Sequence, residues 1–297
     1  MTTALSLLLA AACGFALTAC HSTDNNATRP LPPLPPVAPH PSAPPARAAQ
    51  PQPPTPPTPP LLPIRPASAT PPIALKELFP GVRADLSAKV VEFDAITSPM
   101  LMDDPKAPLF FVETLVCSPD TREHESLFVT DVKPSHLHAA MLAIGLVPGA
   151  PGLFKFENGQ FQPVDATGDR VTVEVHSAQG SASDPRTWLI NVADRDNPEP
   201  RRFGSDAEDA SGGGHGWVFA GSSMRTVADK AGAMQEVYDA DGTGIVVGLC
   251  CFGSEVIAWS RTFSHDASID APEWIADFSR TPPPGTKVRI RLRPVGR

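Results

Sequence analysis

The chain has few cysteines and lacks the common motifs of metal and nucleophile sites. Five of its 297 residues are cysteine, and only Cys117, Cys250 and Cys251 lie beyond the first 20 residues. This number excludes a small fold held together by disulfides. A bridge from Cys117 to Cys250 or to Cys251 remains an open alternative. HExxH, paired CxxC and GxSxG are absent, so the sequence gives no support to a zinc peptidase or a serine hydrolase.

Hydrophobic runs long enough to cross a bilayer are also missing. Ala4 to Ala19 is an apolar run of 16 residues, whereas a spanning helix needs about 20. The run has signal-peptide length and ends in Leu17-Thr18-Ala19-Cys20, which resembles the lipobox of bacterial lipoproteins. The resemblance implies a signal peptide over residues 1–19 and lipidation of Cys20, and His21 in the next position implies the outer membrane. A plain secretory signal or an uncleaved anchor is the alternative, because no Lys or Arg precedes the apolar run.

Positive charge is scarce beyond residue 72. The whole chain has 32 acidic and 24 basic residues, and one acidic and three basic ones precede residue 73. Residues 73–297 therefore carry 31 acidic and 21 basic side chains, a net charge of about −10. Such a surface repels phosphate backbones, so we expect no nucleic-acid partner.

Proline is the one residue type in large excess, and it is concentrated before the acidic part. Residues 30–72 contain 20 prolines, separated mostly by Ala, Thr, Ser and Gln. Proline lacks a backbone N–H and fixes φ, so this segment can neither join a sheet nor continue a helix. We predict that residues 20–72 form a lipidated, disordered tether, and that residues 73–297 form one folded unit.

Strand patterns dominate residues 73–297. Alternating or continuous apolar positions predict strands over 89–96, 109–117, 125–132, 171–179, 187–193, 216–220, 244–251 and 287–294. The second and third are separated by a short turn and predict a hairpin. Ser135 is expected to cap a helix that ends at Gly145, and a shorter helix is expected over 224–233. The predicted fold is a β-rich α+β domain, a mostly antiparallel sheet with one main covering helix.

One stretch is rich in groups that bind metals or carry protons. Residues 116–141 contain one Cys, two Glu and three His. Period-two alternation cannot bring all of them together, and residues two apart on a helix point in different directions. The candidate site that remains is His138 from the helix with Glu125, and with Glu123 or Cys117, which would suit zinc or a similar divalent ion. The alternative is a structural Glu125–His138 hydrogen bond.

A calcium-like motif is a weaker candidate. Asp239-Ala-Asp-Gly-Thr-Gly imitates the start of a calcium loop, but the twelfth position is Cys250 rather than Glu. We predict a hairpin turn there.

Several phrases together resemble the YdjY-domain proteins, which are numerous in planctomycete-type bacteria. They are FPGVRADLSAKVVEFDA (79–95), VCSPDTREHESLFVT (116–130), KPSHLHAAMLAIGLVPGAPG (133–152), GWVFAGS (216–222) and PPPGTKVRIRLRP (282–294). The resemblance implies no established reaction. Some relatives are associated with iron–sulfur clusters, but this chain has no cysteine run that could hold one, so none is expected.

Two functions follow from these patterns. The first is a lipid-anchored, non-enzymatic binding or structural module of the cell envelope, with an envelope protein or a peptidoglycan-associated partner. The second is a periplasmic metal-binding or redox protein that uses the cluster from Cys117 to His138.

Overall fold

The structure is a computed structural model that describes residues 73–104, 106, 108–177, 180–205 and 214–296. The predicted signal peptide (1–19), Cys20 and the proline-rich segment up to residue 72 lie outside the described residues. Within the described residues, no helix is both long and apolar enough to cross a membrane.

Strands make up most of the regular structure. In chain order they are β1 (Lys76–Phe79), β2 (Val82–Asp85), β3 (Val90–Thr97), β4 (Thr114–Cys117), β5 (Ser126–Val129), β6 (Pro148–Ala150), β7 (Leu153–Glu157), β8 (Gln160–Val164), β9 (Thr167–Gly168), β10 (Val171–His176), β11 (Ala182–Ser183), β12 (Leu189–Asn191), β13 (Trp217–Phe219), β14 (Met224–Ala228), β15 (Met234–Tyr238), β16 (Ile245–Gly248), β17 (Ile257–Trp259), β18 (Trp274–Ala276) and β19 (Lys287–Pro294). The α-helices are α1 (Pro134–Ala143) and α3 (Asp239–Thr243), and the 3-10 helices are η1 (Glu123–Glu125), η2 (Pro185–Trp188) and η3 (Val192–Asp194).

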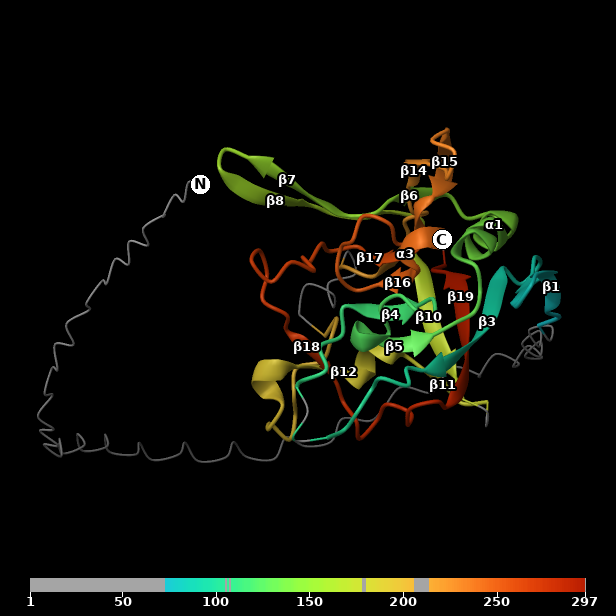
Figure 1. Cartoon of the computed structure of the whole chain (residues 1–297). Helices are drawn as coiled ribbons and strands as arrows, with labels where there is room; N and C mark the ends of the chain where they lie inside the picture. Colours follow the sequence, from blue (N-terminus) through green and yellow to red (C-terminus); the bar gives the residue numbers. More distant parts are fainter. Residues whose placement is uncertain (1–72, 105, 107, 178–179, 206–213, 297) are drawn as a thin grey trace, which may run out of the picture. The chain divides into compact units, whose positions relative to one another are not determined.

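One large sheet organises the domain (Figure 1). Its strand order is β11-β10-β19-β3-β5-β4-β16-β17-β13, with β2 beside β3 and β1 beside β2. Only the pairs β4–β5 and β16–β17 are parallel among the described strands. An isolated bridge joins Arg170, the residue before β10, to Val218 in β13. These two strands lie far apart in the strand order of the sheet. The predicted β-rich, mostly antiparallel fold is confirmed.

The centre of the sheet follows the predicted period-two pattern. In β19, Val288, Ile290 and Leu292 are buried in the core, and β19 pairs with β3 on one side and with β10 on the other. β-Branched and aromatic side chains suit such a half-buried pleated surface, which is why these segments form strands.

The opposite face of these strands carries a buried carboxylate. The Glu92 side chain is only 1% exposed. Arg291 donates to Glu92 Oε2 through Nε (3.0 Å) and Nη2 (2.6 Å), and Arg83 Nη2 lies 3.4 Å from Glu92 Oε1. The buried carboxylate is therefore paired with cations, as the cost of burying a lone charge requires.

The predicted hairpin over residues 109–132 is wrong. β4 and β5 are parallel neighbours, with Val116 opposite Phe128 and Cys117 opposite Val129. Between them the chain turns back through η1, where the Ser126 hydroxyl donates to the Arg122 carbonyl (2.7 Å). All four residues of each strand are buried, and continuous burial is typical of parallel strands.

Helix α1 has the predicted extent but a different cap. Leu137, Met141 and Ile144 are buried, and Gly145 ends the helix with φ of 86°. The Ser135 side chain does not cap the helix. Instead its backbone N–H donates to Asp241 Oδ1 of α3 (2.8 Å).

Two further local predictions are wrong. Residues 224–233 are not helical, because β14 and β15 form a hairpin across this region. Asp239–Gly244 is not a hairpin turn, since α3 occupies it and Gly244 takes φ of 75° at its end.

Candidate functional site

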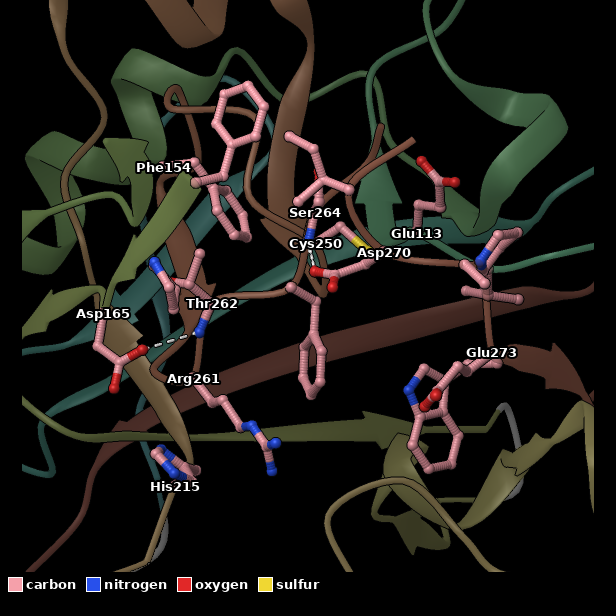
Figure 2. Close-up of a pocket in the computed structure, with 18 residues that line it drawn as sticks. Glu113, Phe154, Asp165, His215, Cys250, Arg261, Thr262, Ser264, Asp270 and Glu273 are labelled. Atoms are coloured by element: carbon pink, nitrogen blue, oxygen red, sulfur yellow. Dashed lines mark hydrogen bonds between the residues drawn. The ribbon is translucent and has the colours of Figure 1, made fainter. Parts of the chain in front are cut away.

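The candidate site is a pocket of about 670 Å³ on the β-rich domain (Figure 2). Its walls come from the residues before β4, from the β7–β8 hairpin, from the segment after β17 and from the segment that leads into β18. The lining residues are Val112, Glu113, Phe154, Phe161, Pro163, Asp165, His215, Cys250, Arg261, Thr262, Phe263, Ser264, Ile269, Asp270, Ala271, Pro272, Glu273 and Trp274. The site therefore brings together residues 112–113, 154–165, 215, 250 and 261–274, which come from distant parts of the chain.

Aromatic rings supply much of the apolar wall. They belong to Phe154, Phe161, Phe263 and Trp274. Trp274 is 8% exposed, and its indole N–H has no hydrogen-bond partner in the structure. Most buried N–H groups are bonded, so this buried donor is an exception.

Carboxyl groups supply most of the charge. Figure 2 shows Glu113 and Glu273 on one side of the pocket and Asp165 on the other. Asp165 Oδ1 accepts from the Thr262 N–H (3.0 Å), and Asp270 Oδ2 accepts from the Ser264 N–H (2.7 Å). These backbone bonds fix two carboxylates at the pocket wall, so the negative charge is held in place.

Glu113 is the chemically unusual member of this group. Burial, the neighbouring negative charge of Glu125 and a hydrogen bond between the two side chains raise the pKa of Glu113 to about 7. The backbones also meet, since the Glu113 N–H donates to the Glu125 carbonyl (3.0 Å). Arg122 Nη1 lies 2.5 Å from Glu125 Oε1. Glu113 therefore keeps its proton to a higher pH than an ordinary glutamate.

Cys250 lies on the same wall, beside Asp270 in Figure 2. Its backbone N–H donates to the Glu113 carbonyl (2.9 Å). Burial first, and then the charges of Glu113, Glu125 and Asp270, raise the pKa of the Cys250 thiol well above its ordinary value. The protonated thiol is a poor nucleophile and a poor metal ligand, because both roles require the thiolate.

No disulfide joins the cysteines of the described residues. Cys117, Cys250 and Cys251 are all free, so the proposed bridge from Cys117 to Cys250 or to Cys251 is not formed. Cys117 is buried within β4, and burial raises its pKa.

His138 has a different partner from the one predicted. Its Nδ1 lies 2.8 Å from the hydroxyl of Tyr238, the only tyrosine in the chain, and that hydroxyl donates to the Gly221 carbonyl (3.1 Å). Burial lowers the pKa of His138, so the imidazole is neutral at pH 7. Glu125 contacts Arg122 and His124 instead, and the predicted Glu125–His138 hydrogen bond is not formed.

Of the four candidate metal ligands, Glu123 and Cys117 lie close enough for the Glu123 charge to act on the thiol, whereas His138 has separate surroundings. Glu123 Oε1 accepts from the Asp120 N–H (2.8 Å), whereas His138 is bonded to Tyr238. In the part of the chain that the structure describes, no group of three or more His, Cys, Asp or Glu side chains is arranged to hold a metal ion. Zinc binding by Glu125, His138, Glu123 and Cys117 stays a prediction from sequence, which elemental analysis of the purified protein tests.

Glu113 is the main site residue that sequence reasoning missed. It lies within the apolar run Leu109–Cys117, where a carboxyl group has to find a partner or a proton. That isolated acid could have been recognised, but its contact with Glu125 could not, because the predicted antiparallel pairing placed other residues opposite it.

The described residues define a β-rich α+β domain with an acidic, aromatic pocket. The chain belongs to the YdjY family, since the model of the YdjY domain matches residues 82–293. No curated protein matches the chain, and no solved structure matches it.

Proposed function

We propose that the chain is a lipid-anchored protein of the outer membrane whose YdjY domain binds an envelope glycan. The pocket is the observation that carries the binding part of this proposal. Its four aromatic rings can pack against the apolar faces of sugar rings, and its fixed carboxylates can accept from sugar hydroxyl groups. The lipobox-like LTAC and the proline-rich segment support the anchored location, with the segment as a spacer.

Peptidoglycan is the envelope polymer that fits this chemistry, because it is built from amino sugars. We expect the purified protein to bind a β-1,4-linked trimer of N-acetylglucosamine or of glucosamine in isothermal titration calorimetry. Phe161→Ala should weaken binding at least tenfold, because the ring lines the pocket.

Phe156→Ala is the matched control. Phe156 belongs to the same hairpin and is 66% exposed, but it does not line the pocket. Phe156→Ala should change the affinity by less than about threefold. The Phe156 ring influences the ligand only indirectly, through its contact with the Phe161 ring. Absence of binding to both trimers would contradict the proposal.

A further inference from the structure

The β7–β8 hairpin carries the aromatic wall of the pocket outward. Figure 1 shows this hairpin reaching out from the body of the domain. Phe154, Phe161 and Pro163 line the pocket. Phe156 lies opposite Phe161 in the hairpin, and the two phenyl rings are 5.2 Å apart. Since side chains alternate between the two faces of a strand, these four residues share one face of the hairpin. The face that begins in the pocket therefore continues to Phe156.

The outer part of this aromatic face is open to solvent and uncharged. Phe156 is 66% exposed and Phe161 is 50% exposed. Lys155 and Glu157 alternate with Phe156 along β7, so within the described hairpin the charged side chains lie on the opposite face. Exposed apolar surface that continues from a pocket is typical of an interaction site.

The root of the hairpin is bonded to the body of the domain on both strands. On the β8 side, the Thr262 hydroxyl donates to the Val164 carbonyl (2.9 Å), and the Thr262 N–H donates to Asp165 Oδ1 (3.0 Å). On the β7 side, the Cys251 thiol donates to the Gly152 carbonyl (2.5 Å). A Cβ at Gly152 would collide with the Thr262 hydroxyl, so this close approach needs glycine. The aromatic face is therefore held in one orientation relative to the pocket.

Charge favours one occupant for this face over the others. Residues 73–297 carry a net charge of about −10, so a second copy of the chain and an anionic lipid surface are both repelled. Segments that enter a lipid surface also depend on Lys and Arg, whereas Lys155 of the hairpin is offset by Glu157. A glycan strand without charge meets no such repulsion, and the apolar faces of its sugar rings can pack on phenyl rings.

We propose that the β7–β8 hairpin is an extension of the glycan site, and that Phe156 contacts sugar units beyond those held in the pocket. A chain that fills the pocket and continues along the hairpin gains this contact, whereas a short oligomer that ends in the pocket does not. The inference rests on the proposed function and names what the site selects, a long glycan strand rather than a fragment.

The experiment compares chain lengths. The trimer and the hexamer of β-1,4-linked N-acetylglucosamine, and in parallel those of glucosamine, are titrated into the full-length protein in detergent by isothermal titration calorimetry. A hexamer contains four overlapping trimers, so counting alone raises its affinity about fourfold. In the series whose trimer binds, we expect the hexamer to bind at least about twentyfold tighter, because the contact with Phe156 adds to the counting effect.

Phe156→Ala tests the assignment, because Phe156 lies outside the pocket lining. It should reduce the hexamer gain to about fourfold and leave the affinity for the trimer within about threefold. Phe156→Tyr keeps the ring and should keep the full gain. Leu153→Ala is the matched control, since Leu153 is 42% exposed on the opposite face of the same hairpin, and it should behave as wild type.

Three results overturn this inference alone. The first is a wild-type gain of only about fourfold, or a larger gain that persists in Phe156→Ala. The second is a dimer that Phe156→Ala dissociates in sedimentation velocity runs, because the face then belongs to a second copy. The third is binding of the Cys20→Ser chain to phosphatidylglycerol vesicles that Phe156→Ala removes, because the face then belongs to lipid. Failure of both trimers to bind overturns the proposed function itself.

Discussion

At the residue scale, Glu255 is a fully buried carboxyl group with one oxygen unsatisfied. Its Oε1 accepts from the N–H groups of Phe252 and Gly253, but Oε2 has no partner. Burial raises the pKa of Glu255 to about 7, although hydrogen bonds from backbone N–H groups lower it in part. The native protein therefore holds a proton there that the unfolded chain releases at lower pH.

This proton makes stability depend on pH. A raised native pKa contributes stability that is fully present below the unfolded value of 4.5 and is lost as the pH rises through about 7. The full loss is on the order of 3–3.5 kcal/mol, since the pKa rises from 4.5 to about 7 and one pKa unit corresponds to about 1.4 kcal/mol. Glu255→Gln should remove most of it, as measured by urea unfolding at pH 5 and pH 8. Parallel pH profiles for wild type and variant would show that Glu255 is not protonated in the native state.

The His138–Tyr238 hydrogen bond replaces a predicted interaction and can be measured directly. We expect His138→Ala and Tyr238→Phe to be coupled by about 0.5–1.5 kcal/mol in the free energy of unfolding. His138→Ala and Glu125→Ala should be additive, because the two side chains have different partners. The opposite result, coupling to Glu125 and additivity with Tyr238, would restore the interaction expected from sequence.

Contacts between side chains that are far apart in the sequence, such as His138 and Tyr238, could not be predicted from the sequence. Leu137, Met141 and Ile144 recur at helical spacing and are buried, so such a stripe can be recognised from the sequence. Tyr238 lies 100 residues from His138, and no periodicity in the sequence connects them.

At the element scale, α1 depends on a cap supplied by another helix. Asp241 accepts from the Ser135 N–H and also pairs with Lys133, whose Nζ lies 3.1 Å from Oδ2. Asp241→Ala should cost about 1 kcal/mol of stability, because an N-terminal donor of α1 loses its acceptor. Lys133→Ala should cost less than about 0.5 kcal/mol of stability, because it removes only an exposed ion pair. The hydrogen bond from the Ser135 N–H to Asp241 stays in place. Urea unfolding measures both, and equal losses would show that the ion pair rather than the cap stabilises this junction.

Elements were predictable where one face is buried and the other is polar. β3, β10 and β19 follow this alternation and lie where the pattern placed them. β4 and β5 are buried throughout, so their sequence pattern does not show whether they pair in parallel or antiparallel. The short segment between them suggested a hairpin that is not formed. β14 and β15 are mostly exposed to solvent. Because neither strand buries one whole face, their sequences show no clear alternation of apolar and polar residues.

At the scale of the whole molecule, the sequence predicts that Cys20 carries the membrane anchor. The full-length protein should partition into the detergent phase in Triton X-114, and Cys20→Ser should move it to the aqueous phase. Cys13→Ser, within the same apolar run, is the control and should leave partitioning unchanged. Equal partitioning of wild type and Cys20→Ser would rule out this anchor.

The proline-rich segment should be dispensable for folding. A chain that begins at Ile73 should melt within a few degrees of a soluble chain that begins at His21, because prolines leave residues 22–72 without apolar periodicity. Differential scanning calorimetry makes the comparison. A large drop in melting temperature would show that the segment packs on the YdjY domain.

The position of β19 also affects how the domain can be made. This strand is the last in the described sequence, yet it lies between β10 and β3 and hydrogen-bonds to both. The ladders that tie β10 and β3 into one sheet therefore cannot form while residues 287–294 are still inside the ribosome.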